Sequence, residues 1–188
     1  MRYTVLLTFI ALFFAGCSDD FTPKPRGFFR IDLPEHSYRK LDLKCGASMD
    51  VPSYARVELR DSVRTDTCWF NVSFPRLNAK LYFTYLPVGN NFETLVEESY
   101  GFAAKHEMKA SGMKRTQFTD DENRLYGILY DIEGEAASQV QFFLTDSTNH
   151  FLRASLYFNH KPNPDSIAPV LAFLRQDILH MAESVRWR

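Results

Sequence analysis

Five histidines are the side chains in this sequence best suited to acid–base catalysis or to metal binding. They are His36, His106, His150, His160 and His180. Each stands alone, with no HxH or HxxxH spacing and no cysteine partner, so none belongs to a recognisable ligand set. Because a lone histidine is more often a surface residue or a hydrogen-bonded core residue, we predict no catalytic histidine.

Other motifs for chemistry are also missing from the sequence. It has no GxSxG nucleophile motif and no glycine-rich phosphate loop. The acidic residues 120–122 could hold a cation, but they lack the alternating ligands of an EF-hand, so we interpret them as a solvated turn. Two cysteines without a nearby histidine pair do not supply four zinc ligands. We therefore predict no catalytic residue, no metal and no cofactor, although active sites can assemble from distant positions.

Residues 1–16 are predicted to be a secretion signal that ends directly before Cys17. Arg2 is followed by the apolar residues 3–14, a run far shorter than the ~20 residues that span a bilayer as a helix. The sequence FAGC is similar to the lipobox of bacterial lipoproteins, in which the cysteine becomes the new N-terminus and carries acyl chains such as palmitate. We predict removal of residues 1–16 and lipidation of Cys17. The alternative is an ordinary signal peptide with a free Cys17.

Cys45 and Cys68 are the two remaining cysteines of this exported chain. In an oxidising compartment a disulfide is the natural pairing. On the chain-entropy model, a disulfide that closes a loop of about two dozen residues would stabilise the fold by about 3–4 kcal/mol. The alternative is two unpaired buried thiols that behave as small apolar side chains.

Length and composition indicate one sheet-rich domain behind a leader. The 188 residues suffice for a single stable core, and the many aromatic residues favour strands. The 22 basic and 23 acidic residues nearly cancel, so no long-range field favours nucleic acid as a partner.

Alternating apolar residues predict strands in two groups. The clearest pattern places Cys68, Phe70, Val72 and Phe74 on one face. It forms a hairpin with the next strand, and three later strands joined by short turns form an antiparallel meander. The predicted strands are residues 54–59, 68–75, 80–88, 126–133, 138–146 and 151–159.

Apolar residues at helical spacing predict two helices, over residues 92–110 and from residue 163 nearly to the C-terminus. Strands, helix, strands, helix is the order of an α+β domain, in which a twisted antiparallel sheet is covered by helices. We assign residues 45–188 to this single domain. The arrangement resembles the PsbP/Mog1 type of sandwich, which is associated with binding and assembly factors.

Residues 17–44 are predicted to be a proline-rich tether between the lipid anchor and the domain. Arg26, Phe28, Phe29 and Arg30 lie within it, and arginine and aromatic residues dominate interface hot spots. We predict that these four residues bind a partner. The alternative is that the phenylalanines pack on the chain's own domain while the arginines pair with acids.

Three segments together resemble the gliding-motility lipoprotein GldD family of the Bacteroidetes. They are the lipobox, the stretch TPKPRGFFRIDLPEHSY, and CWFNVSFPRLNAKLYFTY with its preceding cysteine spacing. The resemblance runs over nearly the whole mature chain. It implies a place in the gliding machinery and the associated type IX secretion system of the cell envelope, and it implies no enzymatic activity.

Two shorter patterns gain meaning from this resemblance. Residues 18–21, SDDF, are similar to the acidic signal that sends some lipoproteins of the phylum to the cell surface; the alternative is a solvated linker. Asp61 and Ser62 resemble the phylum's O-glycosylation acceptor, so Ser62 is a predicted glycosylation site. An outer-membrane lipoprotein, periplasmic or surface-exposed, is therefore favoured over an inner-membrane one.

The sequence thus predicts a lipid-anchored, non-catalytic accessory protein that docks onto other proteins of the gliding and secretion machinery. One alternative is an envelope enzyme or small-ligand binder that acts on glycan or lipid in a pocket between sheet and helix. The other is a purely structural lipoprotein. For the docking protein, we expect neither a nucleic acid nor a small-molecule substrate as a partner.

Overall fold

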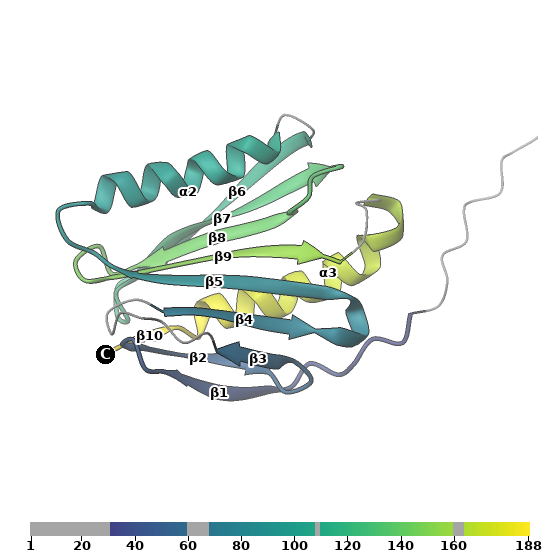
Figure 1. Cartoon of the computed structure of the whole chain (residues 1–188), viewed down its shortest axis with the longest axis horizontal. Helices are drawn as coiled ribbons and strands as arrows, with labels where there is room; N and C mark the ends of the chain where they lie inside the picture. Colours follow the sequence, from purple (N-terminus) through teal and green to yellow (C-terminus); the bar gives the residue numbers. More distant parts are fainter. Residues whose placement is uncertain (1–30, 60–67, 108–109, 160–163) are drawn as a thin grey trace, which may run out of the picture. The chain divides into compact units, whose positions relative to one another are not determined.

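The alternating apolar residues form a seven-stranded antiparallel sheet with the strand order β3-β4-β5-β9-β8-β7-β6 (Figure 1). The computed structural model describes residues 31–59, 68–107, 110–159 and 164–188. The strands are β3 (Arg56–Leu59), β4 (Cys68–Phe74), β5 (Ala79–Pro87), β6 (Ala110–Asp120), β7 (Leu125–Gly134), β8 (Val140–Thr145) and β9 (His150–Phe158). A short 3-10 helix, η1 (Pro75–Leu77), joins β4 to β5.

The predicted hairpin and the predicted meander are both confirmed. Strands β4 and β5 pair antiparallel with Phe70 opposite Phe83 and Val72 opposite Leu81. All four side chains are buried on one face of the sheet. Strands β7, β8 and β9 follow one another as antiparallel neighbours. In β4 the buried side chains of Phe70, Val72 and Phe74 lie on the face that the period-two pattern predicted.

The two predicted helices, α2 (Phe92–Glu107) and α3 (Pro164–Glu183), are confirmed and cover opposite faces of the large sheet (Figure 1). Helix α2 packs through Leu95 and Ala103 in a cluster that includes Phe143 of β8. The neighbouring residue Phe142 points to the other face, into the cluster that contains α3. Strand β8 is buried along its whole length because both of its faces are covered.

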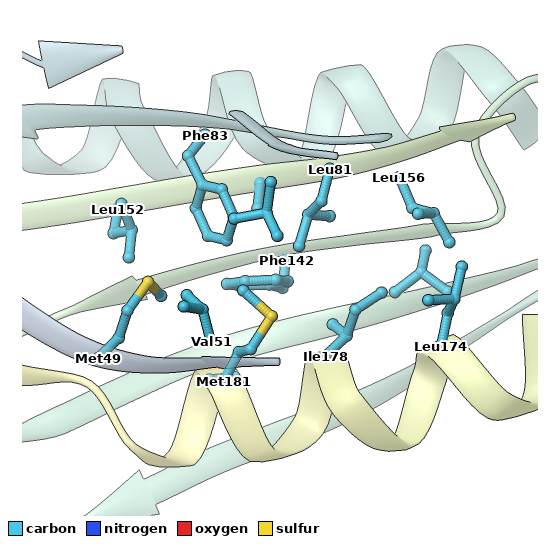
Figure 2. Close-up of a cluster of buried hydrophobic side chains, with 14 of the residues drawn as sticks. Met49, Val51, Leu81, Phe83, Phe142, Leu152, Leu156, Leu174, Ile178 and Met181 are labelled. Atoms are coloured by element: carbon cyan, nitrogen blue, oxygen red, sulfur yellow. The ribbon is translucent and has the colours of Figure 1, made fainter. Parts of the chain in front are cut away.

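The larger core lies between the seven-stranded sheet, α3 and a second sheet. Figure 2 shows Leu174, Ile178 and Met181 of α3 facing side chains of the large sheet, with two residues of the second sheet beside them. The second sheet has the order β1-β2-β10 and consists of β1 (Tyr38–Leu43), β2 (Ala47–Pro52) and β10 (Arg186–Trp187). The described residues thus form an α+β domain with more strand than helix.

None of the three strands of the second sheet was predicted from the sequence. Residues 38–43, which we had placed at the end of the tether, form β1 and pair along their whole length with β2. An extended segment near prolines can be a tether or a strand. The charged sequence YRKLDL shows no clear alternation of apolar residues, because the strand buries chiefly Leu43. Strand β10 has only two residues, too few to show a period.

Two edge positions of the large sheet also differ from the prediction. Strand β6 was not predicted, because Phe118 is its one buried residue and an edge strand needs few apolar residues. In the predicted strand 54–59, Leu59 alternates with Ala55 and Val57, and this spacing is typical of residues that share one face. Its side chain is instead 64% exposed, at the end of the opposite edge strand β3.

The turn between β8 and β9 is one of the short turns of the predicted meander, and it depends on Asp146. Its Oδ1 accepts hydrogen bonds from the backbone N–H groups of Thr148, Asn149 and His150, at 3.0, 2.8 and 2.8 Å. Ser147 adopts a left-handed φ of 66° inside the turn. Burial alone raises the pKa of Asp146, but these hydrogen bonds outweigh it and lower the pKa to about 2.

We expect Asp146→Asn to lower the free energy of unfolding by about 2 kcal/mol at pH 7. The folded-state pKa lies below the unfolded-state value, so this stabilisation is present above about pH 4 and is lost as the pH falls through about 2. Urea unfolding of both proteins between pH 7 and pH 2 measures it. The difference in free energy of unfolding between the two proteins should nearly vanish at pH 2. A difference that stays constant from pH 7 to pH 2 would show that the Asp146 charge is not what stabilises the turn.

Candidate functional site

Asp177 lies on the apolar side of α3, next to Ile178 and one turn from Leu174, and its exposed fraction is 0%. Burying a carboxylate is costly unless hydrogen-bond donors surround it. The contacts of Asp177 therefore identify the site on which this part of the fold depends.

Three side chains from the N-terminal part of the domain bind the Asp177 carboxylate. His36 Nδ1 lies 2.6 Å and the Tyr38 hydroxyl 2.7 Å from Oδ1, and the Tyr54 hydroxyl donates to Oδ2. His36 precedes β1, Tyr38 begins it, and Tyr54 lies in the turn between β2 and β3. We call these four residues the Asp177 clamp, because they attach three segments to one carboxylate.

Two residues of the Asp177 clamp also stack their rings on side chains from the same side of α3. The His36 ring stacks on Phe173 with centroids 4.3 Å apart, and the Tyr38 ring stacks on His180 at 3.7 Å. His180 Nε2 in turn lies 3.3 Å from a carboxylate oxygen of Asp50 on β2. Contacts at residues 173, 177 and 180 recur every three or four residues, which is the spacing of one helix face.

The electrostatics of the Asp177 clamp keep its two phenols protonated. Burial and then the hydrogen bond to Asp177 raise the pKa of Tyr38 and of Tyr54 well above the usual tyrosine value. Both hydroxyls are therefore donors at physiological pH. Because both carboxylate oxygens already accept hydrogen bonds, the arrangement is suited to holding chain segments together.

The clamp fixes the segment that leads into the domain from the predicted tether. Ser37 lies between two clamp residues, and its carbonyl oxygen accepts a hydrogen bond of 2.8 Å from the Ser53 N–H. Ile31 and Leu33, a few residues earlier, are 37% and 38% exposed. The clamp therefore holds the end of the PRGFFRIDLPEHSY stretch on α3, while two apolar side chains before it remain open to solvent.

Cys45 and Cys68, predicted to pair, lie at disulfide-bonding distance with their Cα atoms 6.1 Å apart. They join the turn after β1 to the first residue of β4, so the bond would link the small sheet to the large one. This separation falls within the usual range for a disulfide.

We expect Cys45→Ala/Cys68→Ala to lower the free energy of unfolding by about 3 kcal/mol, since an unfolded chain without the link has more conformational freedom. Denaturant unfolding of the oxidised wild type, the reduced wild type and the double variant measures it. The reduced protein should match the variant, and recovery of both cysteines as free thiols by non-reducing peptide mapping would contradict the bond.

The remaining predicted site residues lie outside the described part of the chain. These are Cys17, Arg26, Phe28, Phe29, Arg30 and Ser62. Their predicted roles in lipidation, partner binding and glycosylation stay predictions.

Of the five histidines, three have side chains within the described residues. His36 and His180 pair with acids, and His150 Nδ1 lies 2.5 Å from the Tyr85 hydroxyl while its ring stacks on Trp187. In residues 31–59, 68–107, 110–159 and 164–188, no three His, Cys, Asp or Glu side chains form a group that could hold a metal ion. The turn at residues 120–122 is closed by Asp120, which accepts hydrogen bonds from the Asn123 N–H and side-chain amide.

Sequence analysis missed the Asp177 clamp, although one signal was present. Asp177 lies three residues after Leu174 and four before Met181, in the middle of the apolar stripe that predicted α3. An acid in such a stripe requires partners. The sequence cannot name them, because His36 is 141 residues away.

The fold and the Asp177 clamp define an α+β domain that is fastened to the end of its own N-terminal segment. The chain belongs to the gliding motility lipoprotein GldD family, whose model matches residues 18–187. No curated protein matches the chain. Family membership makes it a lipoprotein of gliding motility, located in the cell envelope in association with a membrane.

Within the described residues, no helix is long and apolar enough to cross a membrane.

Proposed function

We propose that this protein is a non-catalytic docking component of the gliding machinery and of the associated type IX secretion system. The observation that carries the proposal is the family match over residues 18–187, which covers the tether and the domain together.

The geometry of the Asp177 clamp supports docking through the tether motif. His36 and Tyr38 are bound to α3, and Arg26, Phe28, Phe29 and Arg30 precede them by a few residues along the chain. The exposed Ile31 and Leu33 lie between the two groups. Arginine, aromatic and exposed apolar side chains are the residue types that are common at the centres of interfaces.

Two finer parts of the proposal concern location and fold. We place the lipidated Cys17 in the outer membrane, on the basis of the lipobox and the SDDF stretch that follows it. A resemblance to the PsbP/Mog1 type of sandwich is consistent with helices on both faces of an antiparallel sheet, and binding factors commonly have that fold.

The test is crosslinking and pull-down from native envelope, comparing the wild type with Arg26→Ala/Phe28→Ala/Arg30→Ala at matched abundance. The wild type should fractionate with the outer membrane and retain other proteins of the gliding and secretion machinery. The variant should keep its melting temperature and lose at least one of those partners, together with gliding or secretion.

A matched control replaces Arg39 and Arg56 by alanine, because both are exposed arginines on edge strands of the domain. This control should retain every partner. The docking role is refuted if the tether variant is well folded and retains every partner and every phenotype of the wild type.

A further inference from the structure

A hollow of about 210 Å³ opens on the face of the large sheet that also carries α2. Helix α2 contacts β6, β7 and β8, whereas the hollow lies mainly over β5 and β9. It is lined by the rings of Tyr82, Phe102 and Tyr157 and by the polar side chains of Gln141 and Arg153. Pockets for drug-sized ligands measure ~300–1,000 Å³, so this hollow suits a single ring with one polar group.

Two hydrogen-bond donors of the hollow have no acceptor. Gln141 Nε2 and Arg153 Nη1 are both buried and make no hydrogen bond to any of the described residues. Gln141 is only 5% exposed, and its Oε1 accepts a hydrogen bond of 3.4 Å from Ser155. The amide nitrogen is therefore the free end of that side chain. Buried donors without partners are rare in folded proteins, because each costs free energy.

The charge of Arg153 is only partly balanced. Its Nη1 lies 4.0 Å from the exposed Glu98 carboxylate, beyond hydrogen-bond distance, and its guanidinium lies 4.5 Å from the centre of the Phe102 ring. Burial lowers the pKa of Arg153 and Glu98 opposes that shift. The Arg153 side chain is 23% exposed, but its buried Nη1 carries a positive charge beside a neutral amide donor, and this pair favours a ligand with one negative charge.

We propose that this hollow binds a carboxylate attached to a planar apolar group. The carboxylate oxygens would accept hydrogen bonds from Arg153 Nη1 and Gln141 Nε2, because a planar anion matches the planar guanidinium. The apolar part would pack on the rings of Tyr82, Phe102 and Tyr157. Tyr82 and Phe102 are 43% and 40% exposed, so they can receive a ring without a rearrangement of the core.

The test is titration of the full mature chain, in detergent micelles, with phenylacetate, phenylacetamide and phenyl phosphate. Two-dimensional NMR should show phenylacetate shifting the side-chain signals of Gln141 and Arg153. The neutral amide should bind at least about tenfold more weakly, since it cannot form the charge-assisted hydrogen bonds. Equal affinity for the amide, tighter binding of the phosphate, or no shift with any compound overturns the proposal.

Two variants separate binding from folding. Arg153→Met and Gln141→Met should each weaken phenylacetate binding by at least about tenfold. Gln141→Met should leave the melting temperature unchanged or raise it, because it removes a donor that has no partner in the empty hollow.

Arg115→Met is the matched control. The Arg115 guanidinium also stacks on an exposed aromatic ring, 4.8 Å from the centre of Tyr100, but it does not line the hollow. This variant should bind phenylacetate like the wild type. Unchanged binding in both Arg153→Met and Gln141→Met would overturn the proposal. The inference is independent of the docking role, because the titration uses no partner protein.

Discussion

Replacing Asp177 by alanine should lower the free energy of unfolding by about 3–5 kcal/mol. The change removes the carboxylate that His36, Tyr38 and Tyr54 share in the Asp177 clamp, and with it the acceptor of their hydrogen bonds. Denaturant unfolding monitored by circular dichroism measures the loss. For a domain of this size the melting temperature should fall by roughly 10 °C or more.

The loss should begin where the chain enters the domain. The Ser53 N–H, which donates to the Ser37 carbonyl, should lose most of its protection from hydrogen exchange in Asp177→Ala. Protection of β8 should fall only with the global stability, because both of its faces stay covered.

Asp50→Ala supplies the matched control for Asp177→Ala. Asp50 also pairs with a histidine of the same side of α3, but its side chain is 40% exposed. An exposed ion pair contributes about 1 kcal/mol or less. If both substitutions lower the free energy of unfolding by the same amount, burial of Asp177 does not explain its contribution to stability.

Gly127→Ala should cost about 3 kcal/mol, at the upper end of the usual range for overpacking. Gly127 lies in β7 opposite Leu144, and a Cβ atom added there would come within 2.0 Å of the Phe143 carbonyl oxygen. The obstacle is backbone of a fully buried strand, so no side chain can rotate away. Either β7 or β8 must shift, and the ladder between them must weaken.

Thermal unfolding checks this prediction, with Gly101→Ala as the control. Gly101 lies inside α2, and an added Cβ would meet nothing within 4 Å. Alanine favours a helix over glycine by about 1 kcal/mol, so this substitution should raise the melting temperature. Gly127→Ala should therefore lower the melting temperature, whereas Gly101→Ala should raise it. A neutral Gly127→Ala would mean that the two strands are less closely packed than the structure indicates.

The sequence predicted the elements whose apolar residues are periodic on one face. The β4–β5 hairpin follows from Phe70, Val72, Leu81 and Phe83, and α3 follows from a long apolar stripe. These elements bury a continuous face, so their period shows in the sequence. Strands β1, β6 and β10 bury few side chains or are very short, so their sequences carry little of that signal.

The two sites depend on contacts that no local pattern can show. The Asp177 clamp joins residues more than 120 positions apart along the chain. Gln141 follows a strand pattern in which it should face solvent, yet it is buried because neighbouring strands and Phe102 of α2 enclose it. Sequence reasoning could mark Asp177 as an unusual acid, but only the fold supplies the partners.

The order of contacts after residue 30 has a mechanical consequence if the protein is anchored through Cys17, as the lipobox predicts. Tension that arrives along the chain from the membrane reaches His36 and Tyr38 before it reaches the rest of the β1–β2 ladder. Both residues are attached to α3, whose Leu174 and Ile178 are fully buried. A pulling force is thus transferred first into the middle of the core, and the edge strand β1 is shielded from being peeled away.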